Sequence, residues 1–403
     1  MTDSSLFDAA APIDRFRACL LADPALQQRL SVLSEPEAFV GAMIDAAAGL
    51  GIAIAENEGY AALRADPLGL WRFSGAPVTS RTPPEGDWLP VAVVPSVGEL
   101  AVDWAHFAGQ PLAEPFYEDS LRNARHLPFN RLLQQRTPLV TLAESLGDEL
   151  PVPDGFVFHL SRCGSTLVSQ MFAADPRNIV ISEAPPIDSV VQLGTARTDV
   201  PIELRIMLLR AMVGALGRDR AGASGHFIVK LDSWHTLALP LFRLAFPDTP
   251  WIFLYREPVE ILVSHARMSG SQTVFGALPF DPYGIENGAD MAPDHYAGRA
   301  LGRTASAVIE HFGLGGGLLV NYTELPGAME SRIVPHFGIV PDAAESAAMA
   351  GATRRDAKAP TESFGADSAT KQQEASAELR SIAAAYMDEP YRCLEALRLA
   401  GDT

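Results

Sequence analysis

The residues with the clearest chemical potential lie in the turn Leu160–Thr166, which has the sequence LSRCGST. The mostly apolar residues Gly155–His159 before it predict a buried strand, and the helical spacing of the apolar residues after it predicts a helix that begins near Ser165. In a strand–turn–helix unit of this kind, backbone N–H groups and the positive end of the helix dipole converge on one point. We therefore expect the turn to bind an anion.

The turn differs from the loop that binds nucleoside triphosphates with magnesium. That loop reads GxxxxGK[ST], and its lysine and hydroxyl serve the β- and γ-phosphates and Mg²⁺. Here Gly164 is followed directly by Ser165 and Thr166, and His159 stands where the first glycine would be. A single phosphate still fits the N–H groups from Cys163 to Leu167, so the turn predicts one phosphate and no metal.

A second candidate anion site follows the apolar segment Trp251–Tyr255. Arg256 leaves the end of this expected strand, Pro258 suits a helix start, and Ser264 lies about two helical turns later. A guanidinium and a hydroxyl in this arrangement can hold a phosphate. Each residue alone is common beside an ordinary strand and helix, but the two beside the first turn favour a ligand with two phosphate groups.

From residue 152 onward, apolar strand patterns alternate with helical patterns. This alternation predicts a three-layer α/β/α fold with a central parallel sheet, whose ligands bind beyond the carboxyl ends of the strands. The Gly- and Pro-rich stretch Ser269–Pro293 is expected to form a mobile lid. The expected strands are Gly155–His159, Asn178–Ile181, His226–Leu231, Trp251–Tyr255 and Gly317–Tyr322, and the expected helices are 165–174, 203–216, 235–246, 259–268 and 296–312.

These segments resemble the sulfotransferase family that uses 3′-phosphoadenosine 5′-phosphosulfate (PAPS). The residues from Arg162 to Thr166 are similar to the family's basic-x-Gly-[ST]-[ST] loop, which binds the 5′-phosphosulfate. The residues from Arg256 to Ser264 are similar to its Arg-x-Pro…Ser element, which binds the 3′-phosphate. Leu318–Leu325 resembles the strand and Tyr-Glu-x-Leu segment that follow. The resemblance covers 152–403 and implies a P-loop NTPase-like sulfotransferase fold, a nucleotide-binding biosynthetic transferase, PAPS as donor and 3′-phosphoadenosine 5′-phosphate (PAP) as product.

The resemblance also implies a set of donor-binding residues and no metal ligand. The family's basic, glycine-rich C-terminal segment is represented only loosely, by Arg354, Arg355 and Lys358, with Lys371 a more distant possibility. The other implied donor-binding residues are Arg162, Cys163, Gly164, Ser165, Thr166, Leu167, Arg256 and Ser264.

The catalytic residues implied by the resemblance are Lys230, Arg162 and Glu183. Lys230, at the end of the third expected strand, is similar to the family's lysine, and with Arg162 it would neutralise the leaving phosphate and the sulfuryl oxygens. Glu183 ends the second expected strand and resembles the glutamate base of the tyrosyl-protein and several bacterial members. The alternatives for the base are Asp232, His235 and His265.

The first 150 residues predict two further parts, 1–66 and 67–150, ahead of a sulfotransferase domain at 151–403. The helical pattern of 1–66 resembles the Nif11-like module, and a generic helical cap explains it equally well. Residues 67–150 are rich in Pro and Gly and predict short strands and turns. Their aromatic residues at 102–107 and 114–117 either form core or line an acceptor pocket.

Composition and charge restrict the partners. The net charge of −18 argues against nucleic-acid binding, and no apolar run is long enough to span a membrane. The acidic start and three distant cysteines predict a cytoplasmic protein without disulfides. The expected acceptor is a hydroxyl or amine of a small molecule or peptide, and the oligomeric state is open. Alternatives to the sulfotransferase are a nucleotide-dependent kinase of the same fold and an inactive PAP(S)-binding scaffold.

Overall fold

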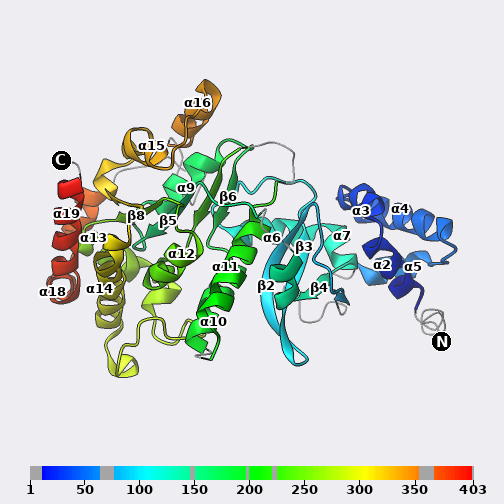
Figure 1. The fold of residues 1–403 in the computed structure, drawn as a ribbon, viewed down its shortest axis with the longest axis horizontal. Helices are drawn as coiled ribbons and strands as arrows, with labels where there is room; N and C mark the ends of the chain where they lie inside the picture. Colours follow the sequence, from blue (N-terminus) through cyan, green and yellow to red (C-terminus); the bar gives the residue numbers. More distant parts are fainter. Residues whose placement is uncertain are drawn as a thin grey trace. The chain divides into compact units, whose positions relative to one another are not determined.

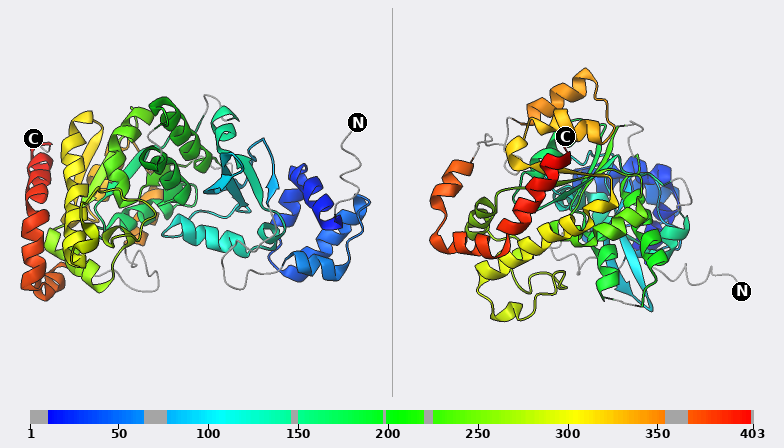
Figure 2. Two further views of the ribbon diagram at one scale, coloured as in Figure 1. Left: turned by 90° about the horizontal axis from the view of Figure 1, so that it is seen from below. Right: turned by 60° about the vertical axis from the view of Figure 1, so that its left-hand side comes forward.

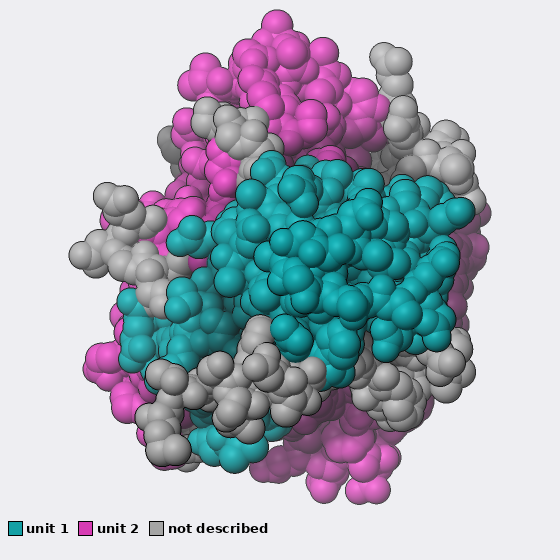
Figure 3. All heavy atoms as spheres, turned by 90° about the vertical axis from the view of Figure 1, so that its right-hand side faces the viewer, with its two compact units in different colours: residues 1–110, 118–148 teal, residues 111–117, 149–403 magenta. Residues whose placement is uncertain are grey.

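The structure is a computed structural model that describes residues 11–63, 77–145, 150–196, 199–219, 225–353 and 367–401. The chain forms two compact units, which Figure 3 colours separately. Unit 1 comprises 1–110 and 118–148, and unit 2 comprises 111–117 and 149–403. The short segment Pro111–Tyr117 thus belongs to unit 2, although its neighbours in the sequence belong to unit 1. The sequence-based division at residues 66 and 150 stays a prediction.

Unit 1 contains a helical part and a small four-stranded sheet (Figure 1). The helical part buries Phe16, Leu20, Phe39 and Met43, which recur at helical spacing in α2 and α4. Its helices are α2 (Pro12–Leu21), α3 (Pro24–Ser31), α4 (Pro36–Gly49) and α5 (Glu56–Ala62). The sheet has the strand order β1-β4-β3-β2. Its strands are β1 (Val78–Thr79), β2 (Trp88–Ser96), β3 (Glu99–His106) and β4 (Gln135–Pro138), and the helices of this part are α6 (Tyr117–His126), α7 (Pro128–Leu132) and α8 (Leu139–Ser145).

The aromatic residues near 102–107 form part of the core of unit 1. Trp104 is buried and donates a hydrogen bond from Nε1 to Thr137 Oγ1 at 2.9 Å. His106 is also buried, and its backbone N–H donates to Asn130 Oδ1 at 2.8 Å. A buried indole with its polar atom satisfied is a core residue, so the core interpretation of this stretch is the better one.

Unit 2 is built on a five-stranded sheet of order β6-β7-β5-β8-β9, in which every neighbouring pair is parallel. The predicted three-layer fold is therefore confirmed, and the observed strands lie within one or two residues of the predicted ones. They are β5 (Gly155–His159), β6 (Ile179–Ser182), β7 (Phe227–Lys230), β8 (Trp251–Tyr255) and β9 (Gly317–Asn321).

Alternate side chains of the strands enter two different cores, as a sheet covered on both faces requires. On one face Val157 and Ile252 pack with residues of α9 (Ser165–Ala173), α15 (Val334–His336) and α16 (Ala343–Ala352). On the other face Phe156 and Phe158 contact Phe242 at centroid distances of 5.4 Å each. The helices on that second side are α10 (Pro185–Ala196), α11 (Ile202–Leu216), α12 (Leu239–Ala245) and α14 (Pro293–His311), as Figure 1 shows.

The expected helix 235–246 begins differently from the prediction. A 3₁₀ helix, η1 (Ser233–Ala238), comes first, and α12 starts only at Leu239. Pro240 lies in the first turn of α12, where its missing N–H costs nothing, but it cannot continue a helix that started earlier. This break places Trp234 and His235 in η1, close to the end of β7.

The C-terminal helices of unit 2 pack along α13 and α14, as the views of Figure 2 show. They are α17 (Ser368–Glu374), α18 (Ala377–Tyr386) and α19 (Asp388–Gly401), and α13 spans Pro258–Arg267. Among the described helices, none is long and apolar enough to cross a membrane.

Candidate active site

The turn between β5 and α9 has the backbone geometry of an anion cradle. Gly164 has a φ of 87°, and a Cβ atom there would lie 2.8 Å from the side chain of Leu325, so the position requires glycine. Arg162 also has a positive φ, of 63°. The first N–H groups of a helix lack partners within the helix, so those at the start of α9 are available to a ligand. Cys163 is buried and its Sγ donates to the carbonyl of Leu254, so its contribution to an anion is limited to its backbone.

Lys230 brings a positive charge to this turn from the end of β7. Its side chain is fully buried, and its Nζ lies 3.5 Å from Thr166 Oγ1 on α9 and 2.6 Å from Glu183 Oε1 at the end of β6. Glu183 has a φ of 53°, and its N–H donates to the carbonyl of Lys230 at 2.8 Å. The three residues come from neighbouring segments at the carboxyl edge of the sheet, where the sequence had placed a ligand site.

Glu183 is held in its ionised form. Burial would raise the pKa of its carboxyl group, but the Lys230 ammonium and the nearby imidazole of His159 outweigh burial and hold that pKa well below its usual range. His159 Nε2 lies 3.4 Å from Glu183 Oε1. While Lys230 stays beside it, Glu183 is therefore a weak proton acceptor.

Two further residues complete the surroundings of the turn. Phe116, from the segment that joins unit 2 from the middle of the chain, places its ring centroid 4.8 Å from Lys230 Nζ. Arg162 donates from Nη2 to the carbonyl of Met268 at 2.8 Å, and Gln272 donates to Ser161 Oγ at 2.7 Å. The expected lid segment after α13 thus contacts the turn directly.

Arg256, the expected 3′-phosphate ligand, is buried and already paired with carboxylates. Its Nε donates to Glu260 Oε2 at 2.5 Å and its Nη2 to Asp367 Oδ1 at 2.7 Å. Its guanidinium lies over the ring of Tyr322, 3.9 Å from the centroid. Asp367 also accepts from Lys371 Nζ at 2.6 Å. An incoming phosphate would have to replace Asp367 at this position.

Of the other residues expected around the 3′-phosphate, the structure describes Ser264 and Lys371. Ser264 lies on α13, and its hydroxyl donates to the carbonyl of Glu260 at 2.8 Å. Lys371, which the sequence indicated only as a more distant possibility, forms an ion pair with Asp367, and Asp367 in turn accepts a hydrogen bond from Arg256. Arg354, Arg355 and Lys358 lie outside the described residues.

Sequence reasoning missed Asp188 and Asp367, and it gave Phe116 only as part of the core or of an acceptor pocket, whereas its ring lies over Lys230. Asp188 stands in the first turn of α10, five residues after Glu183, and its contact with His235 spans 47 residues. Asp367 contacts Arg256 across 111 residues, and no local pattern indicates either carboxylate.

No protein-family model matches the chain, and no curated protein matches it. The resemblance of residues 1–66 to the Nif11-like module is therefore unsupported. Among solved structures, a sulfotransferase domain from the curacin biosynthetic pathway is similar, with 13% identity over 62% of this chain and 98% of that chain, at a TM-score of 0.37. A sulfotransferase from Mycobacterium avium has 14% identity over 62% and 81%, also at 0.37. A sulfotransferase domain from the olefin synthase of Synechococcus PCC 7002 has 16% identity over 62% and 96%, at 0.37. The chain is distantly similar to these sulfotransferase domains, and its function is inferred from its own site.

Proposed function

We propose that the chain is a sulfotransferase that moves the sulfuryl group of PAPS to a hydroxyl or amine of a small-molecule or peptide-derived acceptor. The observation that carries the proposal is the position of Lys230 Nζ, 3.5 Å from Thr166 Oγ1 at the anion-binding turn and 2.6 Å from Glu183 Oε1. An ammonium group beside a cradle of N–H groups suits a leaving phosphate, and this cradle lacks the lysine of a triphosphate loop.

The donor would bind through two phosphate groups. The 5′-phosphosulfate would occupy the backbone N–H groups of residues 162–167, with Lys230 beside the leaving oxygen and Arg162 beside the sulfuryl oxygens. The 3′-phosphate would bind Arg256 and Ser264 in exchange for Asp367, with Arg354, Arg355 and Lys358 as further candidates.

The reaction needs one bond formed and one broken at sulfur. The acceptor oxygen or nitrogen bonds to sulfur, the bond from sulfur to the bridging oxygen breaks, and its electron pair stays on the 5′-phosphate of PAP. A carboxylate takes the acceptor's proton. The two candidates are Glu183, beside Lys230, and Asp232, two residues after it. The cations of the chain stabilise the leaving group, so the proposed reaction uses no metal.

We infer the partners and the location of the proposed reaction from the sequence. A net charge of −18 disfavours nucleic acid and highly sulfated polymers as partners. We place the reaction in the cytoplasm and leave the oligomeric state open.

Turnover of PAPS labelled in its sulfuryl group tests this function. Wild-type protein should convert PAPS to PAP and release the label as sulfate or as sulfated acceptor. Lys230→Met should slow this conversion by about 10²–10³-fold, the usual effect of removing one donor to a developing negative charge. Asp248→Asn, an exposed change in the loop before β8, is the matched control for remote charge loss and should have no effect. Equal conversion by wild type and Lys230→Met would contradict the proposal.

A further inference from the structure

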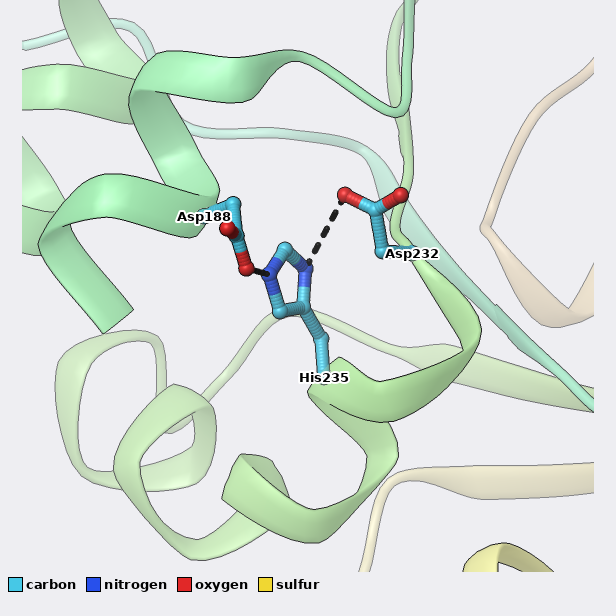
Figure 4. Close-up of side chains that lie close together, drawn as sticks. All are labelled: Asp188, Asp232 and His235. Atoms are coloured by element: carbon cyan, nitrogen blue, oxygen red, sulfur yellow. Dashed lines mark hydrogen bonds and ion pairs between the residues drawn. The ribbon is translucent and has the colours of Figure 1, made fainter. Parts of the chain in front are cut away.

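Beside the Lys230–Glu183 pair lies a second cluster of ionisable groups, made of Asp188, His235 and Asp232 (Figure 4). Asp188 Oδ1 lies 2.9 Å from His235 Nε2, and Asp232 Oδ2 lies 3.9 Å from His235 Nδ1. The imidazole therefore stands between two carboxylates. Asp188 comes from α10 and Asp232 from the end of β7, and His235 comes from η1.

Asp188 fixes the orientation and the tautomer of His235. Its Oδ1 accepts hydrogen bonds from Trp234 Nε1 at 2.7 Å and from Gln192 Nε2 at 3.2 Å, in addition to the contact with His235. Burial would raise the pKa of the Asp188 carboxyl group, but these donors, His235 first, lower it below its usual range. An ionised carboxylate only accepts, so His235 Nε2 carries a proton that it donates to Asp188.

His235 Nδ1 lacks a hydrogen-bond partner among the residues that the structure describes. The side chain is only 1% exposed, and leaving such an atom unpaired costs about 1–3 kcal/mol. Asp232 Oδ2, the carboxylate oxygen facing it, is beyond hydrogen-bond distance at 3.9 Å. A proton delivered between these two atoms would give His235 Nδ1 a hydrogen-bond partner.

Asp232 is placed to receive that proton from the acceptor. It follows Lys230 by two residues, and the Leu231 N–H still donates to Val157 O, so Lys230 and Asp232 leave the extended chain on the same side. Both carboxylates of the cluster are more exposed than the imidazole between them: the Asp232 side chain is 11% exposed and the Asp188 side chain 20%, whereas His235 is 1% exposed. Glu183 is held by Lys230 at 2.6 Å.

We propose that Asp232, His235 and Asp188 form a relay that takes the acceptor's proton during sulfuryl transfer; this rests on the proposed function. Asp232 is the catalytic residue, and His235 and Asp188 are positioning residues. As the acceptor oxygen bonds to sulfur and the bond to the leaving phosphate breaks, the acceptor proton moves to Asp232. It then passes to His235 Nδ1, which in this relay is unprotonated before the transfer, while the Nε2 proton stays on Nε2 and is donated to Asp188. This is the division of roles in which a buried carboxylate orients an imidazole.

An apolar cluster packs against Trp234, the residue next to His235. Trp234, whose indole N–H holds Asp188, packs against a group formed by Tyr283, Ile285 and Tyr296 from the expected lid and α14. Burial raises the pKa of the Tyr283 hydroxyl, so this group stays neutral. The expected lid thus places a neutral, mostly apolar group against Trp234.

The test compares acceptors that differ in whether a proton must be removed. The full-length protein is assayed with labelled PAPS at mildly alkaline pH, with 2-phenylethanol and water as acceptors that must lose a proton, and 4-nitrophenol as one that is largely ionised already. Asp232→Asn should slow transfer to 2-phenylethanol and to water by about 10²–10⁴-fold. It should slow transfer to 4-nitrophenol by less than about tenfold, because no proton has to leave.

The positioning residues should show the same dependence on the acceptor. His235→Gln and Asp188→Asn should both lose more activity with 2-phenylethanol than with 4-nitrophenol, and Asp232→Glu should recover part of the rate. A merely structural role would reduce both reactions equally. Asp248→Asn again serves as the matched control.

Binding of PAP, measured by calorimetry on each variant, separates the two proposals. Wild-type protein that binds no PAP would overturn the proposed function and the relay with it. The relay alone is overturned if PAP binds but Asp232→Asn slows all acceptors equally or none, or if Glu183→Gln, and not Asp232→Asn, shows the acceptor-dependent loss. Wild-type protein that binds PAP and transfers to none of the three acceptors also overturns the relay.

Discussion

The charge of Lys230 decides what the turn at residues 161–166 can hold. A fully buried ammonium needs a partner, and in this structure Glu183 provides it at 2.6 Å. A phosphosulfate in the turn would offer Lys230 a second partner, of higher charge. We therefore expect Lys230 to exchange its partner when the donor binds, from the Glu183 carboxylate to the leaving phosphate.

The Lys230–Glu183 pair should also be visible in the pH dependence of stability. Because the pKa of Glu183 is lower in the folded protein, the pair stabilises fully above the pKa of an unfolded glutamate, about 4.3, and loses this effect as the pH falls further. Glu183→Gln leaves the Lys230 charge unpaired and should lower the free energy of unfolding by about 3 kcal/mol near neutral pH.

Urea unfolding of wild type and Glu183→Gln across a pH series measures this effect. The difference between the two proteins should be constant from neutral pH down to about pH 5 and should shrink below about pH 4. A difference that grows as the pH falls would contradict the assigned ionisation of Glu183.

At the scale of elements, the sequence indicates the sheet and its turns better than the residues that meet there. The strands β5 and β8 begin and end where the apolar segments predicted, because a buried parallel strand is recorded locally as an apolar run. Lys230 was found because it ends a strand, and Gly164 because it stands in the turn between β5 and α9.

The residues that were missed depend on packing between distant segments. Asp367 contacts Arg256 across 111 residues, and Asp188 contacts His235 across 47. Neither contact leaves a periodic or spaced pattern in the sequence. The packing of α17 on α13, and of α10 beside η1, had to be seen before these carboxylates could be assigned to the site.

The packing of α17 on α13 gives a prediction for donor binding. Asp367 occupies the Nη2 group of Arg256 and the ammonium of Lys371, so it competes with a phosphate for both. Asp367→Asn should tighten PAP binding by about five- to tenfold, the effect of removing one ion pair of about 1 kcal/mol. Arg256→Ala should weaken it by at least as much.

Calorimetric titration with PAP tests both changes, and Arg392→Ala, an exposed arginine on α19, is the control. Weaker binding in Asp367→Asn would mean that the carboxylate orders the site instead of competing for it.

At the scale of the whole molecule, a short segment and the overall charge bear on function. Pro111–Tyr117 belongs to unit 2 and brings Phe116 to Lys230. A ring at this distance stabilises an ammonium by about 0.5–2 kcal/mol. Phe116→Ala should therefore lower turnover of labelled PAPS by about two- to thirtyfold, and Phe116→Tyr, which keeps the ring, should restore most of it. Equal rates in wild type and Phe116→Ala would remove the ring from the site.

The proposed activity does not depend on a metal ion. Within the described residues, Asp188, Asp232 and His235 are close enough together to hold an ion, yet we assign them to proton transfer. Turnover should therefore be unchanged in excess EDTA. Loss of turnover with EDTA that added Mg²⁺ restores would favour a kinase of the same fold.

Calorimetric titration of the full-length protein with PAP, and separately with ATP and Mg²⁺, tests the central claim most directly. The cradle at residues 161–166, served by Lys230 and without a triphosphate-loop lysine, predicts saturable, EDTA-resistant binding of PAP that weakens at least about tenfold in Lys230→Met, the loss of about 1.4 kcal/mol. ATP with Mg²⁺ should bind more weakly than PAP. Absence of PAP binding to the wild type, or tighter binding of ATP with Mg²⁺, would contradict the account.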